Sequence, residues 1–349
     1  MLKRPELRTL NLKNTVLLPA ALHLLALLTL GILAFAQPCT SASAKCTDWV
    51  RLGSKGDKTL VYTTYPLAGR NTKIKRAFIL VHGAGRNADD YFKSAVAAAF
   101  LADALDDTIV ISPRLASNGG DSCKDPLEAG EINWNCDFWR SGGPSQNAPD
   151  FNSFDLMDEL LRKLSNKDVF PSLTNIVVSG HSAGGQYVTR YGMVNTIHEK
   201  IGTKVSYIVS NPSSYAYPDS NRPAGSSGEQ KEFSDSKNCT TYNKWPYGLA
   251  DRFGYSTKVS DEQIRKQLAE RTVIYLLGGL DTLPIAGFDG KCPAMAQGSS
   301  RLERGQAFSN YVIQKYGARH RTVVVPLCGH NARCMFTDNL ALPLVFPKQ

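Results

Sequence analysis

Residues 175–185 read Asn-Ile-Val-Val-Ser-Gly-His-Ser-Ala-Gly-Gly, and this stretch decides the fold. Its first five residues form a short apolar run that predicts a β-strand. The run leads through a Gly-x-Ser-x-Gly pattern, residues 180–184, into a predicted helix. Glycines on both sides of Ser182 let the chain turn so tightly that the serine projects from the sheet. The stretch therefore predicts a strand, a sharp turn with Ser182 as a candidate nucleophile, and a helix; an ordinary glycine-rich turn is the alternative.

The alternation of apolar runs and helical spacing extends in both directions from this stretch. Continuous apolar runs are typical of parallel strands that are buried on both faces. Predicted strands lie at 60–65, 77–81, 108–111, 205–210, 273–277 and 322–325, and predicted helices at 87–106, 154–164 and 301–316. This order predicts an α/β fold with a mostly parallel central sheet flanked by helices. Residues 211–260, rich in Pro, Ser, Tyr, Asn and Gly, are predicted to be an inserted cap or long loop region.

The N-terminal 36 residues differ from the rest of the chain. Four basic residues precede an uncharged stretch at 15–36 that is dominated by Leu and Ala. This pattern is typical of a secretory signal peptide, and a membrane anchor at 15–36 is the alternative. We expect a signal peptide or membrane anchor at 1–36, an N-terminal linker segment at 37–54, and one domain at 55–349 with its insertion at about 211–260.

Composition and charge limit the class of protein. Of the 349 residues, 42% are hydrophobic and 20% are charged, which is ordinary for a globular protein. The formal net charge is +9, and loss of residues 1–36 would leave +6. This surplus fits an anionic substrate, or a transient association with a membrane or cell wall, as well as a basic surface without a partner. No dense Lys/Arg run with interleaved aromatic residues occurs, so nucleic-acid binding is not expected.

The chain contains eight cysteines, at positions 39, 46, 123, 136, 239, 292, 328 and 334. An even number in an exported protein indicates disulfides, and we expect a secreted, extracellular location. Proximity along the chain favours Cys39 with Cys46, Cys123 with Cys136, and two bridges among the last four. No CxxC pair occurs, so no metal site is expected.

A serine nucleophile needs a general base, and the base needs an orienting acid. Asp281 follows the predicted strand at 273–277 and is the candidate acid, while His330 follows the last predicted strand and is the candidate base. We expect Ser182, Asp281 and His330 to converge at one edge of the sheet. Five competitors occupy less suitable places in the strand order: Asp251, Asp261, Asp289, His198 and His320.

Such a site also needs backbone N–H groups that stabilise an oxyanion. One donor is expected at Ala183, the residue after the nucleophile. The other is expected at Ala84, in the loop after the strand at 77–81, with Gly83 or Gly85 as alternatives. His82, which precedes this loop, is expected to hold the loop by a hydrogen bond and not to act as a base.

These motifs together resemble the α/β-hydrolase superfamily of esterases and lipases over about residues 55–345. They are His82-Gly83-Ala84-Gly85, Gly180-His181-Ser182-Ala183-Gly184, Asp281 and Gly329-His330. The resemblance implies a triad of Ser182, Asp281 and His330 that cleaves carboxylic esters through an acyl-enzyme, without a metal or organic cofactor. The expected partner is a small-molecule or polymer-linked ester. An amidase or peptidase with the same triad, and a non-catalytic binding protein on this fold, are the alternatives.

Aromatic residues in two loops are candidates for the substrate pocket. They are Trp134, Phe138 and Trp139 before the nucleophile, beside Arg140, and Tyr215, Tyr217, Trp245 and Tyr247 in the predicted insertion. Such side chains bind acyl chains, aromatic acids or sugars, or else pack their loops onto the sheet. We take Trp134, Trp139 and Tyr215 as the substrate-binding candidates.

Overall fold

The computed structural model describes residues 37–119, 123–224, 229–285 and 287–347. Contacts between Cα atoms divide the chain into residues 1–36 and 37–349, and all described residues belong to the second unit. The predicted signal peptide or membrane anchor at 1–36 lies outside the described residues. Within the described ranges, no helix is both long and apolar enough to cross a membrane.

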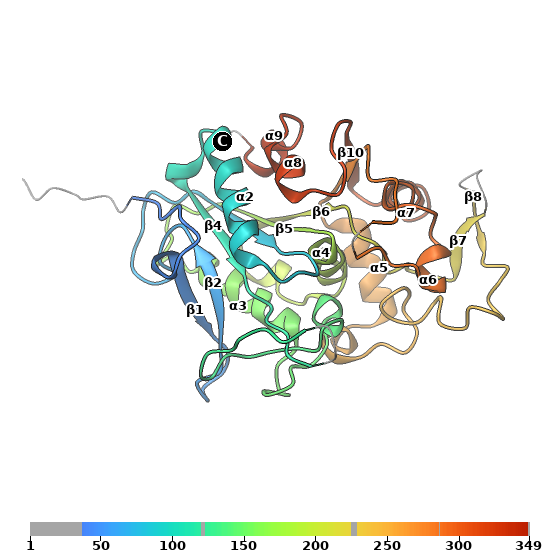
Figure 1. The fold of residues 1–349 in the computed structure, drawn as a ribbon, viewed down its shortest axis with the longest axis horizontal. Coiled ribbons are helices and arrows are strands. Elements are labelled where there is room, and N and C mark those ends of the chain that lie inside the picture. The colour runs from blue at the N-terminus through green and yellow to red at the C-terminus, as the bar shows by residue number, and fades with distance from the viewer. Residues whose placement is uncertain (1–36, 120–122, 225–228, 286, 348–349) are drawn as a thin grey trace, which may run out of the picture. The chain divides into compact units, whose positions relative to one another are not determined.

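A single large sheet organises the described part of the chain (Figure 1). Its strand order is β1-β2-β4-β3-β5-β6-β9-β10; β2 pairs antiparallel with both β1 and β4, and all other pairs are parallel. This arrangement confirms the predicted mostly parallel sheet. The strands are β1 (Thr47–Arg51), β2 (Lys58–Thr63), β3 (Arg76–Val81), β4 (Thr108–Pro113), β5 (Asn175–His181), β6 (Lys204–Ser210), β9 (Val273–Gly278) and β10 (His320–Val325).

The structure differs from the sequence prediction at residues 37–54. This segment is not a linker, because β1 lies within it and pairs with β2 from Thr47 opposite Tyr62 to Arg51 opposite Lys58. Val50 is fully buried, whereas Thr47, Asp48 and Trp49 are half-buried. A five-residue edge strand with one buried apolar side chain lacks the continuous apolar run that marks the central strands, so no sequence pattern predicts it.

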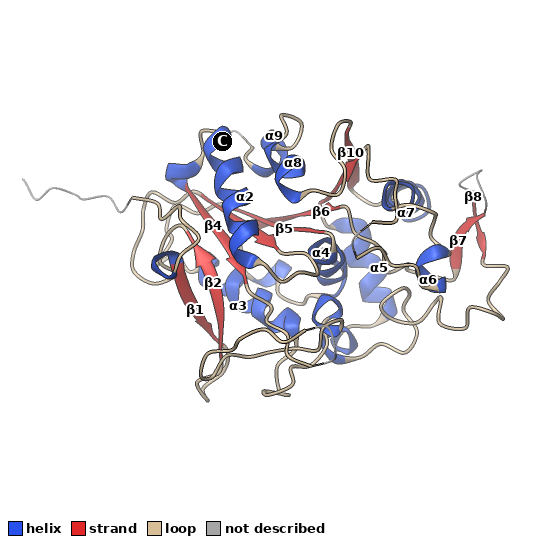
Figure 2. Ribbon diagram, viewed as in Figure 1, coloured by secondary structure: helices blue, strands red, loops and turns tan. Residues whose placement is uncertain are grey.

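Helices cover both faces of the sheet, as Figure 2 shows. Phe78 and Leu80 of β3 point into a core with α2, α8 and α9, while Ile79 and Val81 point into the larger core with α3, α4, α5 and α7. Alternate residues of a strand face opposite sides, which explains why β3 is apolar throughout. The helices are α2 (Ala88–Leu101), α3 (Ser153–Ser165), α4 (Ala183–Val194), α5 (Asp261–Glu270), α6 (Cys292–Met295), α7 (Arg301–Tyr316), α8 (Ala332–Thr337) and α9 (Leu342–Val345).

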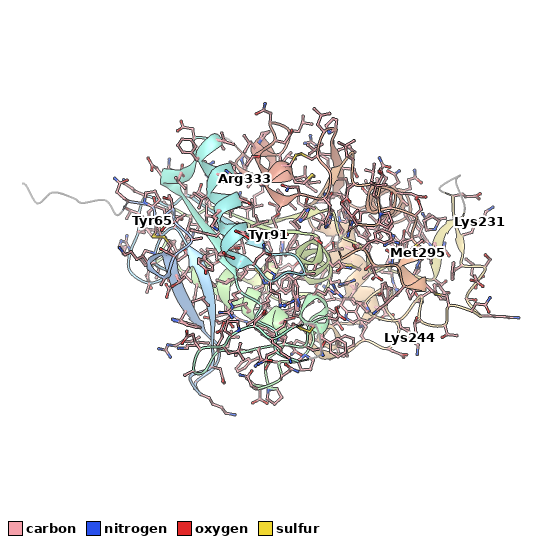
Figure 3. All side chains as sticks on the ribbon, viewed as in Figure 1. Tyr65, Tyr91, Lys231, Lys244, Met295 and Arg333 are labelled. Carbon is pink, nitrogen blue, oxygen red and sulfur yellow. A yellow bond between two sulfur atoms is a disulfide. The ribbon has the colours of Figure 1, made fainter. Side chains whose placement is uncertain are left out.

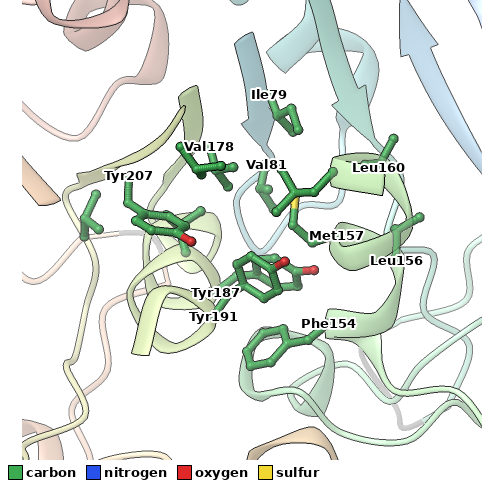
Figure 4. Packing of buried hydrophobic residues seen from close by; sticks show 14 of the residues in the cluster. Ile79, Val81, Phe154, Leu156, Met157, Leu160, Val178, Tyr187, Tyr191 and Tyr207 are labelled. Atoms are coloured by element: carbon green, nitrogen blue, oxygen red, sulfur yellow. The ribbon is translucent and has the colours of Figure 1, made fainter. Parts of the chain in front are cut away.

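Helix α4 is buried along its whole length. Tyr187 and Tyr191 pack against Phe154 of α3 in edge-on ring contacts (Figure 4). The Tyr187 hydroxyl donates to the Ser153 carbonyl at 2.9 Å, and the Tyr191 hydroxyl donates to the carboxylate of Asp158 at 2.7 Å. These contacts fix α4, and therefore the residue at its N-terminus, relative to the sheet.

Residues 211–260 contain little regular structure. The antiparallel strands β7 (Asn221–Ala224) and β8 (Glu229–Glu232) form a small sheet of their own, visible in yellow at one end of the fold in Figure 1. Farther along, the indole N–H of Trp245 donates to the carbonyl of Ser141 at 2.9 Å. This contact ties the segment to the short helix η3 (Phe138–Ser141) in the loop before α3.

All eight cysteines are paired. The bridges Cys39–Cys46 and Cys123–Cys136 are those that proximity predicted. The last four cysteines form Cys239–Cys292 and Cys328–Cys334, with Cα atoms 5.9 and 5.8 Å apart. The first of these two joins the 211–260 segment to α6, and the second closes the loop that carries His330.

Candidate active site

Ser182 lies at the turn between β5 and α4. Its backbone has φ 60° and ψ −120°, a conformation unusual for a residue with a side chain. A β-carbon on Gly180 would overlap the carbonyl of Gly184, and one on Gly184 would overlap the carbonyls of Val81 and His82. The two glycines of the motif therefore allow β5, α4 and the end of β3 to pack closely enough to form the turn.

A continuous hydrogen-bond chain links Ser182, His330 and Asp281. The Ser182 hydroxyl lies 2.9 Å from His330 Nε2, and His330 Nδ1 lies 2.7 Å from Asp281 Oδ2. Asp281 follows β9 and His330 follows β10, so both side chains come from the same edge of the sheet as Ser182. The side chains of His330 and Asp281 are 8% and 1% exposed, so that water competes little for these hydrogen bonds.

Arg301, the first residue of α7, lies behind Asp281. Its guanidinium is 3.4 Å from the second carboxylate oxygen of Asp281 and also donates to Ser213 Oγ at 2.7 Å and to the Ile285 carbonyl at 2.9 Å. Both charged side chains are fully buried, and burial lowers the pKa of Arg301 while Asp281 counteracts that effect. No sequence pattern singles out Arg301, because an arginine at a helix start carries no signal of which residue it contacts.

The loop after β3 lies against the turn at Ser182. Gly83 to Arg86 form a tight turn closed by the Arg86 N–H and the Gly83 carbonyl, with Ala84 inside it. His82 is fully buried, with Nδ1 2.9 Å from the Gly83 carbonyl and Nε2 accepting from the N–H of Leu115 at 3.0 Å. Burial lowers the pKa of His82 to about 4, so the ring is neutral and holds the loop, as expected from the sequence. Ala183, the first residue of α4, has an N–H without an acceptor in its own helix.

Ser182, His330 and Ala84 open into a cleft of about 400 Å³. Tyr91 and Arg333, both labelled in Figure 3, also line this cleft. The Tyr91 hydroxyl lies 3.0 Å from Nδ1 of His181, whose ring packs 4.6 Å from that of His330. Burial lowers the pKa of His181 well below its usual value, and so a neutral imidazole supports the ring of His330.

The competing acids and histidines lie elsewhere, in other contacts. Asp251 pairs with Lys244, Asp261 with Arg252, and Asp289 accepts from the hydroxyl of Tyr247. His198 and His320 contact the hydroxyls of Tyr207 and Tyr275. Among the described residues, no group of three His, Cys, Asp or Glu side chains could hold a metal ion.

The three predicted substrate-binding aromatic residues do not line the cleft. Trp134, Trp139 and Tyr215 are fully buried and belong to the large core beneath the sheet. The prediction for these residues is corrected, because an aromatic ring in a loop buries more apolar surface by packing inward than by facing a cleft. Of the other aromatic candidates, Phe138, Trp245 and Tyr247 line a separate cavity.

Solved structures of other proteins share this fold. A poly(aspartic acid) hydrolase-1 from Sphingomonas sp. KT-1 superimposes with a TM-score of 0.60 at 21% identity, over 86% of this chain and 97% of that one. A poly(3-hydroxybutyrate) depolymerase from Bordetella parapertussis superimposes with a TM-score of 0.58 at 17% identity, over 86% and 94%. No curated protein matches in sequence. The sequence profile of the alpha/beta hydrolase family matches residues 78–341, and the chain belongs to this family.

Proposed function

We propose that this protein is an exported serine hydrolase that cleaves carboxylic esters through an acyl-enzyme. The observation that carries the proposal is the unbroken chain from Ser182 through His330 to Asp281, which opens into a cleft. A serine hydroxyl becomes an effective nucleophile when a neutral imidazole accepts its proton and a buried carboxylate holds that imidazole.

The reaction proceeds in two steps. Ser182 Oγ attacks the ester carbonyl and its proton passes to His330 Nε2, while Asp281 holds the ring by its Nδ1–H. His330 then gives the proton to the departing alcohol, and the acyl group stays on Ser182. A water molecule, deprotonated by His330, attacks the acyl-enzyme and releases the acid, which restores the free serine.

The N–H groups of Ala84 and Ala183 are proposed to bind the oxyanion of each tetrahedral intermediate. Ala183 starts α4, so the positive end of the helix dipole adds to its N–H. Each such donor is worth about 3 kcal/mol in the transition state. The hydrogen bonds of His82 hold the Ala84 loop in place before substrate arrives.

The proposal also covers where the protein folds and how large a substrate its cleft accepts. Four disulfides are typical of proteins that fold in an oxidising compartment. The cleft holds about 400 Å³, room for one acyl group of modest size. The two similar solved structures are named for hydrolysis of polymers, so polymer-linked esters belong in the substrate panel.

The test is Ser182→Ala, assayed on p-nitrophenyl esters of increasing chain length and on matched anilides. We expect loss of at least a thousandfold in kcat for esters, with the folded state intact by circular dichroism. Ser165→Ala, at the end of α3 and away from the cleft, is the matched control with unchanged kcat. Ester turnover retained by Ser182→Ala, or failure of a fluorophosphonate to label Ser182 in the parent protein, would refute the proposal.

A further inference from the structure

A second cavity, of about 650 Å³, lies apart from the cleft at Ser182 and shares no lining residue with it. Its walls come from η3, from the chain at 238–247 and from the chain at 289–293. Gln186 and Arg190 of α4 also line it, four and eight residues after Ser182 and therefore about 6 and 12 Å farther along the helix axis. The proposed ester hydrolysis uses none of these residues.

The walls of this cavity are held together before any ligand arrives. Cys239 and Cys292 both line it and are joined by a disulfide. The indole of Trp245 is bound to the Ser141 carbonyl, and the hydroxyl of Tyr247 donates to Asp289 at 2.8 Å. Three chain segments far apart in sequence are thus fixed around one space, and little conformational entropy remains to be lost on binding.

Arg190 is a buried cation without a carboxylate partner. It is 1% exposed, and its guanidinium donates only to neutral acceptors: the carbonyls of Pro246 and Arg140 and the hydroxyl of Ser214. No Asp or Glu among the described residues forms an ion pair with it. Burial, together with the nearby charge of Arg140, lowers the pKa of Arg190 to about 9. The nearby carboxylate of Asp289, which also lines the cavity, counteracts this effect only in part. A buried charge without a direct ion pair is unfavourable, and an anion bound to the guanidinium would stabilise it further.

The rest of the lining is also more positive than negative. Arg140 is paired with Asp137, and Lys244 with Asp251. Lys291 lines the cavity and forms no ion pair with any described residue. Asp289 already accepts the hydroxyl of Tyr247. Lys291 and Arg190 are therefore the two cations left for a ligand.

Aromatic rings supply an apolar wall. Phe138 is 50% exposed, unusual for a phenylalanine, and its ring centroid lies 5.5 Å from that of Phe253. Both line the cavity. A flat ring of a ligand can stack on this pair while its charged group reaches the cations.

We propose that this cavity is a binding site for an aromatic carboxylate, with the acid group paired to Arg190 and Lys291 and the ring on Phe138 and Phe253. The site is separate from the proposed triad and does not depend on it. Binding neutralises the guanidinium of Arg190 and leaves Ser182 free.

The test is isothermal titration of the Ser182→Ala protein with benzoate, and with benzamide as the neutral analogue of the same shape. We expect benzoate to bind at least tenfold more tightly than benzamide, and its affinity to fall as salt is raised. Lys291→Gln should weaken benzoate by about fivefold to tenfold and Arg190→Met should abolish its binding. Lys266→Gln, an exposed lysine of α5 outside the cavity, is the matched control without effect.

A second arm keeps the test decisive if Arg190→Met fails to fold. Lys291→Glu and Phe138→Ala lie at the exposed rim and leave the buried hydrogen bonds of Arg190 intact. Both should weaken benzoate and leave unfolding temperature unchanged. Equal affinity for benzoate and benzamide, no benzoate binding, or affinity insensitive to Lys291→Glu and Phe138→Ala overturns the proposal. Parent protein labelled at Ser182 by a fluorophosphonate should still bind benzoate; loss of binding there would assign the ligand to the cleft instead.

Discussion

The backbone of Ser182 is strained, and its neighbours sustain the strain. A non-glycine residue at φ 60° costs about 1–3 kcal/mol. The N–H of Ser182 donates to the Ser210 carbonyl of β6 at 2.9 Å, and the buried elements β5 and α4 hold the residue from both sides. Because the strain is sustained by packing, the hydroxyl keeps one direction, toward His330.

Arg301 gives a prediction at the same scale. Arg301→Met removes the cation beside Asp281. A nearby positive charge then no longer favours the neutral, proton-accepting imidazole of His330 over its cation. We expect kcat/KM for an ester to fall about tenfold to a hundredfold and the acidic limb of its pH profile to move to higher pH. The measurement is kcat/KM from pH 5 to 9.

Arg304→Met is the control for Arg301. Arg304 is equally buried on α7, but it donates to the carbonyls of Ser213, Gly298 and Asp289 and does not contact Asp281. Arg304→Met should lower the stability of the fold without moving the acidic limb of the pH profile. An identical pH profile for Arg301→Met and the parent protein would show that the ion pair serves only to stabilise the fold.

At the scale of elements, the close approach of α4 to the end of β3 decides whether the turn at Ser182 can form. Gly184→Ala places a methyl group on the carbonyl oxygens of Val81 and His82. We expect a loss of about 3 kcal/mol or more in the free energy of unfolding, since neither backbone can move away. Gly290→Ala, where nothing lies within 4 Å of the added carbon, should change stability by about 0.5 kcal/mol or less. Urea unfolding measures both variants, and equal stabilities would contradict the steric overlap expected at Gly184.

The two C-terminal disulfides should differ in effect. Cys239 and Cys292 are 53 residues apart, and loss of their bridge should cost about 4 kcal/mol of stability. Cys328 and Cys334 are 6 residues apart, so loss of their bridge should cost only about 2 kcal/mol. That shorter loop carries His330, however, so the double serine variant at 328 and 334 should lose more kcat/KM than the variant at 239 and 292. Urea unfolding and ester assays of the two double variants test whether stability and activity follow opposite orders. A larger activity loss for the variant at 239 and 292 would contradict the prediction.

At the scale of the whole molecule, two neutral histidines, His82 fully buried and His320 half-buried, make stability depend on pH. Burial lowers the pKa of His82 and of His320 to about 4 in the folded protein, against 6.5 in the unfolded chain. As pH falls, the unfolded chain therefore takes up protons before the folded protein does. The stability that the two neutral histidines contribute is complete above pH 6.5 and is lost as pH falls toward 4. At pH 5 each such residue costs about 2 kcal/mol.

His320→Gln isolates one of these contributions. The side chain lies at the start of β10 with Nδ1 3.0 Å from the hydroxyl of Tyr275, a contact that an amide can replace. The variant should lose about 2 kcal/mol less stability than the parent between pH 7.5 and pH 5, measured by urea unfolding. The same loss in both proteins would show that His320 is protonated in the folded state.

The order of strands and helices was readable from the sequence because apolar runs report burial on both faces of a parallel sheet. The same order located Ser182, Asp281 and His330, since each follows a strand whose end lies at one edge. The edge strand β1 was not readable, because a strand with one buried apolar side chain resembles a polar connection. The burial of Trp134 and Trp139 could not be predicted from the sequence either, since both lie in loops whose direction depends on what they pack against.

The sequence alone thus determined the fold class, the disulfide pairs nearest in the chain and the three side chains that meet at Ser182, because spacing and residue type along the chain decide those features. Tertiary structure alone decided that Arg301 contacts Asp281, that Arg190 lines a cavity and donates only to neutral acceptors, and that the aromatic side chains of the loops turn inward. A side chain's partner across the fold depends on the packing of distant segments, and no local pattern records it.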